Sequence, residues 1–173
     1  NQKFNEKGWP PFAIGVGVNS GVMRVGDMGS QIRKAYTVMG DAVNLGSRLE
    51  GITKQYGVDI IIGESTKARI SGIVLREIDL VQVKGKDEPV TIYEPLGLEG
   101  EVEQPRLDEI KLWGQALRYY RAQEWDKAEL QLINLKKVSA RPYLYDVFLG
   151  RIAGFRADPP EPEWRGVHKF ESK

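Results

Sequence analysis

The fold is decided by residues 35–51, AYTVMGDAVNLGSRLEG, which begin as an extended apolar segment and turn at Gly40-Asp41. After the turn, apolar side chains recur at helical spacing, which predicts a helix with one buried face. Its members are Ala42, Leu45, Leu49, Ile52 and Tyr56. Asp41 is suited to cap this helix, because its short carboxylate can accept a backbone N–H of the first turn.

Two polar residues of this helix, Asn44 and Arg48, lie four positions apart. They therefore share a second face and project together. An amide and a guanidinium side by side near a helix N-terminus suit an anionic, oxygen-rich ligand. Taken alone, the pattern favours the ordinary alternative, a solvated polar face.

The exact order of residues in this stretch favours a ligand-binding role over a solvated face. Residues 36–50, YTVMGDAVNLGSRLE, closely resemble the signature of class III nucleotidyl cyclases, the adenylyl and guanylyl cyclase catalytic domain. Two further stretches, Ile14–Gly21 (IGVGVNSG) and Val83–Lys86 (VKGK), lie in the family's order and at compatible spacing. Several ordered motifs are more specific than one short match, so the chain is identified as a member of this family over residues 11–97.

Composition narrows the class of protein. The chain has 173 residues, 41% hydrophobic and 28% charged, which suits one or two small folded domains. A net charge of +1 without a dense basic run gives no reason to expect nucleic acid. The absence of cysteine excludes a disulfide scaffold and a zinc–thiolate site, and is compatible with a reducing cytoplasm.

No apolar run approaches the roughly 20 residues that span a bilayer. The chain opens on Asn1 rather than Met, so we expect a piece of a longer protein. We expect a cytoplasmic location, including the cytoplasmic side of a parent anchored in the membrane through an upstream sensor region.

The remaining pattern predicts an α+β or α/β sandwich with a mainly antiparallel sheet, of which we choose α+β. The resemblance implies a ferredoxin-like cyclase sandwich that is incomplete at its N-terminus. Strands are expected at 12–18, 22–26, 36–39, 58–62, 74–83 and 90–96, the first two forming a hairpin, with a turn at 27–30 and a short helix at 65–70. The spacing of Gly15, Gly17 and Gly21 is wrong for a dinucleotide-binding loop, and no helix follows.

We divide the chain into residues 1–97, the C-terminal part of the catalytic domain, a linker at 98–106, and a helical tail at 107–173. Helices are predicted at 107–121, 125–138 and 142–156. The order Trp113-Gly114, Tyr120, Trp125, Ala128 and Pro142 resembles one tetratricopeptide unit, as in the tails of some bacterial adenylate cyclases. One unit cannot bury its own faces, so we expect it to pack on the cyclase domain or on a partner, with the tail docking through Trp164.

The resemblance assigns roles to four residues. Arg48 matches the arginine that stabilises the transition state, and Asn44 the asparagine that orients the ribose. Lys84 matches the lysine that meets the terminal phosphates of the nucleotide. Thr37 falls where the family distinguishes adenine from guanine, and a threonine there resembles the bacterial subgroup that uses ATP. Thr37 is also an ordinary β-branched strand residue.

The family holds Mg²⁺ or Mn²⁺ with two aspartates on strands that precede the segment at Ile14. Asp27 and Asp41 do not match them, and His168 is expected to be a packing or surface residue, so no metal site is assigned to this chain. The resemblance implies a homodimer whose sites form between protomers, with this chain supplying the Asn/Arg half and inactive alone. The alternatives are an inactive cyclase-like regulatory or dimerisation module, or a guanylate cyclase.

Overall fold

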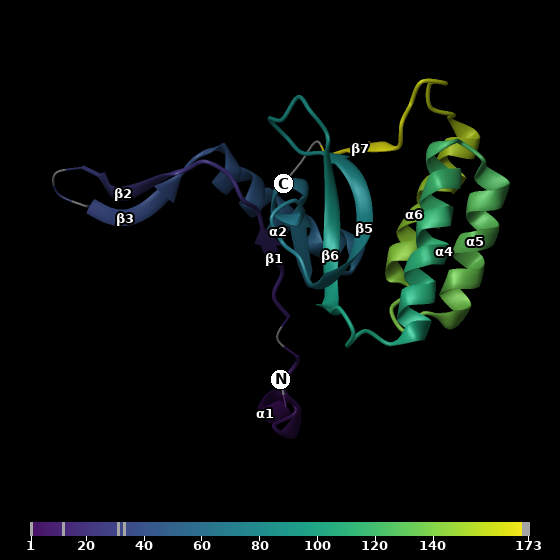
Figure 1. Cartoon of the computed structure of the whole chain (residues 1–173), viewed down its shortest axis with the longest axis horizontal. Coiled ribbons are helices and arrows are strands. Elements are labelled where there is room, and N and C mark those ends of the chain that lie inside the picture. The colour runs from purple at the N-terminus through teal and green to yellow at the C-terminus, as the bar shows by residue number, and fades with distance from the viewer. Residues whose placement is uncertain (1, 12, 31, 33, 171–173) are drawn as a thin grey trace.

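A computed structural model describes residues 2–11, 13–30, 32 and 34–170. Figure 1 shows the arrangement of its helices and strands. In chain order they are α1 (Gln2–Glu6), β1 (Val16–Val18), β2 (Arg24–Gly29), β3 (Lys34–Met39), α2 (Asp41–Tyr56), β4 (Ile60–Gly63), α3 (Glu64–Lys67), β5 (Ile73–Gln82), β6 (Val90–Leu98), α4 (Gln104–Arg121), α5 (Trp125–Val138), α6 (Tyr143–Ala157) and β7 (Val167–Lys169).

The main sheet has five strands in the order β1-β4-β6-β5-β7. The β4–β6 and β5–β6 pairs are antiparallel, whereas β1–β4 and β5–β7 are parallel. The α+β class is confirmed, and antiparallel pairs account for most of the paired positions as expected, although both edge strands of the sheet pair in parallel. Parallel pairing requires a crossover, which α2 provides between β1 and β4 and the α4–α6 helices provide between β5 and β7.

Strands β2 and β3 form a separate antiparallel ribbon, which projects from the body of the molecule as an arm (Figure 1). The predicted hairpin between 12–18 and 22–26 was therefore wrong, and so was the turn at 27–30, because β2 continues to Gly29. Phe12, the first residue of that predicted hairpin, lies outside the described residues. All six residues of β3 are exposed, so its sequence carries no alternation that could fix a pairing register.

One continuous core lies on a single face of the sheet, under α2 and the α4–α6 helices. Asp79 of β5 shows that both groups of helices cover the same face, because its carboxylate bonds Tyr56 of α2 and Arg151 of α6. Tyr93 of β6 is next to Ile92, the cross-strand partner of Asp79, and so points to the other face. There the ammonium of Lys67 in α3 lies 4.9 Å from the centre of the Tyr93 ring.

Helix α2 packs against β1 with its backbone in contact. A Cβ atom on Gly17 would lie 2.1 Å from the carbonyl oxygen of Gly46, so only glycine permits this approach. Gly17 thus permits the close packing of α2 on β1.

The three predicted tail helices are confirmed, although α4 begins at Gln104, three residues before the predicted start. The likeness to a tetratricopeptide unit stays a prediction. Trp164 docks as expected, with its ring 5.0 Å from that of Phe155 and 5.3 Å from that of Tyr120. In the described part of the chain, no helix is both long and apolar enough to cross a membrane.

Candidate functional site

The first turn of α2 faces the hairpin that joins β5 to β6. Gly40 is the N-cap residue, and no side chain caps this terminus, so the predicted capping role of Asp41 was wrong. Asp41 is instead the first residue of the helix, and its carboxylate forms an ion pair with Lys86 of the hairpin. This pair joins the start of α2 to the VKGK motif.

Arg48 lies two turns further along α2 and is half-buried. Its guanidinium reaches the same hairpin, where a Cβ on Gly85 would lie 3.2 Å from Nη2. Nη1 of Arg48 is buried and has no hydrogen-bond partner among the residues that the structure describes. A buried donor without an acceptor costs free energy, so this N–H group is suited to donate a hydrogen bond to an oxygen of an anionic ligand.

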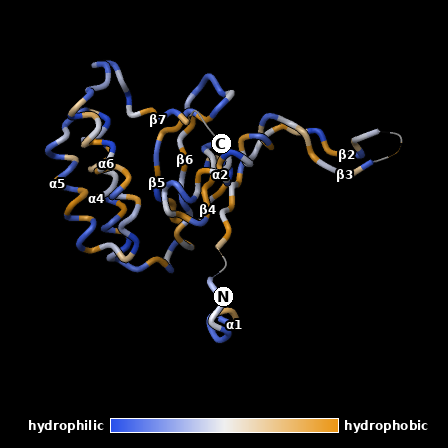
Figure 2. Tube along the Cα trace, turned by 180° about the vertical axis from the view of Figure 1, so that it is seen from behind, coloured by the Kyte–Doolittle hydropathy of each residue, from blue (hydrophilic) through white to orange (hydrophobic). Residues whose placement is uncertain are grey.

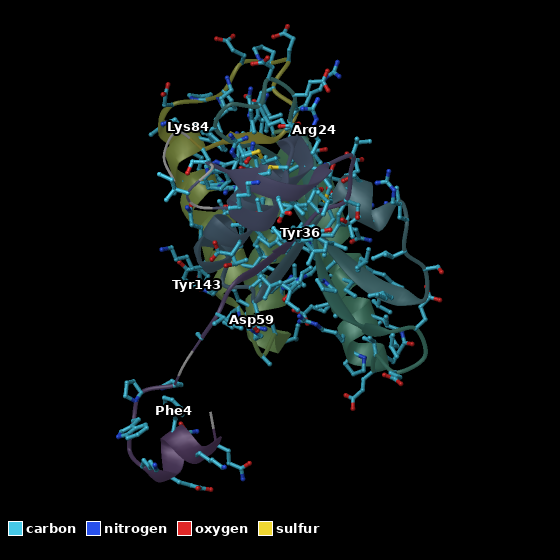
Figure 3. The ribbon with its side chains drawn as sticks, turned by 90° about the vertical axis from the view of Figure 1, so that its left-hand side faces the viewer. Phe4, Arg24, Tyr36, Asp59, Lys84 and Tyr143 are labelled. Atoms are coloured by element: carbon cyan, nitrogen blue, oxygen red, sulfur yellow. The ribbon has the colours of Figure 1, made fainter. Side chains whose placement is uncertain are left out.

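Lys84, just past the end of β5, is exposed and shares a cavity of about 240 Å³ with Arg48. The cavity has two cations at its wall and apolar side chains beside them. Its remaining lining residues are Ser47, Glu50, Gly51, Ile52, Val83 and Phe170. Figure 3 shows Lys84 at the upper end of the body in that view.

The other two predicted residues lie outside this cavity. Asn44 is exposed on α2, one turn before Arg48. Thr37 is exposed on β3 of the arm, opposite Gly26 of β2. The structure thus brings Arg48 and Lys84 together at one cavity. Asn44 lies on α2 with Arg48, and Thr37 lies on the projecting ribbon that carries Tyr36 (Figure 3).

Three residues near the cavity did not emerge as site residues from the sequence. Gly85 and Lys86 lie inside the VKGK motif, and the positive φ of Gly85, 72°, is a backbone feature that favours glycine there. Phe170 comes from the far end of the chain, and no local pattern connects it with α2.

Glu50 is the carboxylate that lines the cavity of Arg48 and Lys84. No cluster of three or more His, Asp or Glu side chains that could hold a metal occurs among the described residues. Asp27 is exposed on β2. The ring of His168 packs at 4.7 Å from that of Phe170, while burial and the nearby positive charge of Arg151 lower its pKa to about 4. The described residues of this chain therefore do not fit a metal centre of their own.

The sequence resembles adenylate cyclases. It is 44% identical over 104 residues to an adenylate cyclase of Anabaena cylindrica, covering 53% of this chain and 21% of that protein. It is 34% identical over 99 residues to adenylate cyclase 1 of Rhizobium meliloti, covering 57% of this chain and 15% of that protein. The chain thus spans about a fifth or less of the length of these relatives.

The fold resembles the crystal structure of the adenylyl cyclase CyaB from P. aeruginosa. The likeness has a TM-score of 0.51 at 32% identity, covering 59% of this chain and 52% of that chain. The sequence profile described as "Adenylate and Guanylate cyclase catalytic domain" matches residues 1–94, which include every element from α1 to β5 and the first residues of β6. With more than half of its length matched, the chain belongs to the adenylate and guanylate cyclase catalytic domain family.

Proposed function

We propose that the protein containing this chain converts ATP to 3′,5′-cyclic AMP and pyrophosphate, and that this chain supplies the Arg48 and Asn44 half of each site. The single observation that best supports this is the buried, unpartnered Nη1 of Arg48 beside Lys84. Two cations, one with an unused donor, suit a polyphosphate. The likeness to adenylate cyclases favours ATP.

In this reaction the ribose 3′-oxygen forms a bond to the α-phosphorus, and the bond from that phosphorus to pyrophosphate breaks. Negative charge grows on the phosphoryl oxygens, so catalysis rests on positioning and on fixed positive groups. Arg48 is the better donor to the transition state, since its planar fork can bridge two oxygens. Lys84 acts as a point charge on the terminal phosphates.

Asn44 and Thr37 complete the proposal. Asn44, one turn from Arg48, orients the ribose through its amide. The hydroxyl of Thr37 accepts a hydrogen from the adenine amino group. Since Thr37 lies on the exposed arm, its contact with a nucleotide would be made where the arm meets another copy of the chain.

The family's metal, Mg²⁺ or Mn²⁺, would be held by carboxylates outside this chain, in the strands expected before Ile14. When bound it would neutralise charge on the phosphates. The roles proposed for Arg48, Asn44, Lys84 and Thr37 are contacts with the nucleotide and not with the metal.

A homodimer partner is part of the proposal. The arm presents apolar side chains to solvent: Val25 is 55% exposed, Tyr36 76% and Met39 58%. Figure 2 shows apolar positions along this ribbon. A projecting apolar ribbon is suited to contact a second copy, which would bring the metal carboxylates of one protomer to the Arg48 of the other. This chain alone would then be inactive.

The test measures cyclic nucleotide formation from ATP and from GTP by the intact protein, with Arg48→Ala beside it. We expect cyclic AMP, and a loss of about a hundredfold or more in the variant, as for one charge-stabilising donor. Arg69→Ala is the control, because Arg69 is exposed and its guanidinium donates to the carbonyl of Ser65, one turn before it. An unchanged rate in Arg48→Ala would overturn the assignment.

Two other outcomes lead to the alternatives. Cyclic GMP in place of cyclic AMP would make the protein a guanylate cyclase. No product from either nucleotide, with a folded dimer confirmed, would make it a regulatory or dimerisation module.

A further inference from the structure

The last turn of α2, at the other end of the helix from Asn44, is held by a buried polar cluster. Tyr56 is fully buried, and its hydroxyl donates to Oδ2 of Asp79 at 2.7 Å. Arg151 of α6 donates from Nη1 to the same Oδ2 at 2.6 Å and from Nη2 to the Tyr56 hydroxyl at 3.1 Å. One guanidinium from the tail thus binds the catalytic helix and the sheet together.

The cluster is charged and largely excludes water. The side chain of Arg151 is 12% exposed and that of Asp79 is 1% exposed. The second oxygen of Asp79 accepts the backbone N–H of Leu80 at 2.8 Å. Burial, reinforced by the Asp79 carboxylate, raises the pKa of Tyr56 well above its ordinary value, so its hydroxyl stays a donor. A buried carboxylate with one cation is sensitive to the loss of that cation.

The position of Arg151 is itself fixed by aromatic packing. Its guanidinium carbon lies 4.8 Å from the ring centre of Phe148 in α6 and 5.4 Å from that of Tyr56. Such stacking orients the planar group. The hydrogen bonds to Tyr56 and Asp79 therefore have a defined direction.

The chain beyond α6 makes a second contact with the same region. β7 pairs with β5 from Leu80↔Val167 to Gln82↔Lys169, and the N–H of Phe170 donates to the carbonyl of Gln82 at 2.9 Å. The Phe170 ring lies edge-on to Tyr56 at 6.2 Å and lines the cavity of Arg48 and Lys84. The tail thus touches α2 near its end and β5 two residues before Lys84.

We propose that Arg151 is a positioning residue for the cyclase reaction, which fixes α2 through Tyr56 and Asp79 so that Arg48 meets the phosphates correctly. This inference rests on the proposed function. The layer formed by α4, α5 and α6 would then contribute to catalysis by holding α2 in position. Because a small misplacement of a catalytic group lowers turnover strongly, the effect should fall on kcat more than on binding.

The test uses the intact protein and Arg151→Met, which removes the charge and keeps most of the volume. We expect kcat for cyclic AMP to fall about tenfold to a hundredfold, with KM for ATP changed less than about threefold. Arg151→Lys keeps a positive charge beside the carboxylate of Asp79, so its kcat should lie between that of Arg151→Met and that of the unaltered protein. The matched control is Arg156→Met, on the same helix, where Arg156 forms exposed ion pairs with Asp126 and Glu129 of α5.

A second measurement separates positioning from mere support of the fold. In an Arg48→Ala background, Arg151→Met should lower kcat little further, because the residue through which it acts is gone. If Arg151→Met lowered kcat by the same factor in the Arg48→Ala background as in the unaltered protein, the inference would be overturned. If Arg151→Met fails to fold, the pair Asp79→Asn with Arg151→Gln leaves no buried charge unpaired, and should fold while retaining the kcat defect.

The outcomes distinguish this inference from the function on which it rests. No cyclic nucleotide from the unaltered protein would overturn the proposed function and this inference with it. Cyclic AMP from the unaltered protein, with equal kcat in Arg151→Met and Arg156→Met, would overturn this inference alone.

Discussion

The guanidinium of Arg48 lies against Gly85, so that a Cβ on Gly85 would be 3.2 Å from Nη2 of Arg48. This contact joins the helix that carries the proposed transition-state donor to the hairpin that carries Lys84. The Asp41–Lys86 ion pair joins the same two elements at the start of the helix. The conformation of the hairpin therefore determines where both cations of the cavity lie.

We expect Gly85→Ala to lower turnover at least about tenfold, because a displaced Arg48 would no longer fit the transition state. The added methyl group must move Arg48, and the φ of 72° at Gly85 disfavours any residue with a Cβ. That backbone strain costs about 1–3 kcal/mol. The measurement is kcat together with the thermal midpoint of unfolding.

Gly72→Ala is the control for strain alone. Gly72 has a similar φ of 75°, and a Cβ placed on it would have no other atom within 4 Å. Gly72→Ala should lose about as much stability as Gly85→Ala and keep the activity of the unaltered protein. Equal losses of activity in the two variants would show that the Arg48 contact is unimportant.

A second buried network joins the tail to the sheet. Arg76 of β5 is buried and donates from Nε to Glu94 of β6 at 2.9 Å and from Nη1 to the Tyr145 hydroxyl at 3.2 Å. That hydroxyl in turn donates to Glu109 of α4. We expect Arg76→Met to lower the free energy of unfolding by about 3–5 kcal/mol, because the buried carboxylate of Glu94 loses its cation, while Glu109 retains its ion pair with Arg106.

Urea denaturation measures this loss of stability, and a substitution in an exposed ion pair serves as the control. Arg141 forms an ion pair with Asp59 at 3.1 Å, and both side chains are largely solvated. Arg141→Met should cost no more than about 1 kcal/mol. A similar cost for both substitutions would contradict the importance given to the buried network.

The sequence predicts those parts of the fold that have one buried face. Leu45, Leu49 and Tyr56 give α2 a helical period because the sheet covers that face. The arm lacks such a signal, since no residue of β2 or β3 is buried, and its pairing was accordingly predicted wrongly. β7 has three residues, and its pairing partners on β5 lie 87 positions earlier in the chain, so no periodicity can reveal it.

In the candidate site, too, the sequence predicts what local motifs mark and does not predict contacts between distant segments. Arg48 and Lys84 come from family motifs, but their shared cavity depends on a hairpin conformation that spacing alone does not define. Arg151, Tyr56 and Asp79 lie in three separate elements, and nothing local marks them as partners. Long-range polar contacts of this kind are set by the packing of the tail.

His168 of β7 should make stability depend on pH. Burial and the nearby Arg151 lower its pKa to about 4 against the opposing effect of Asp79, from an ordinary value of 6.5. Between pH 6.5 and pH 4 the unfolded chain therefore binds a proton that the folded chain does not, so stability falls as the pH falls through this window.

The free energy of unfolding, measured at about pH 7 and about pH 5, should decrease less in His168→Gln than in the unaltered protein. Glutamine cannot take up the proton, so this contribution to the decrease disappears. An equal decrease in both proteins would show that other groups cause it.

The docking of the tail should depend on Trp164. Its ring packs on Phe155 and Tyr120, and its Nε1–H donates to the carbonyl of Val167 at 3.1 Å, at the start of β7. We expect Trp164→Ala to lower the free energy of unfolding by about 3 kcal/mol, the lower end for a large aromatic side chain. Trp9→Ala, at a 51% exposed side chain, should cost less than about 1 kcal/mol.

Hydrogen exchange then shows where the stability is lost. The N–H of Phe170, which bonds the carbonyl of Gln82, should exchange faster in Trp164→Ala, because β7 loses its anchor and opens locally. The N–H groups that pair β5 with β6 should keep their protection. If the Phe170 amide remained protected, β7 would hold its place on β5 through the strand pairing alone, and Trp164 would not be what fixes the wall of the Arg48 cavity.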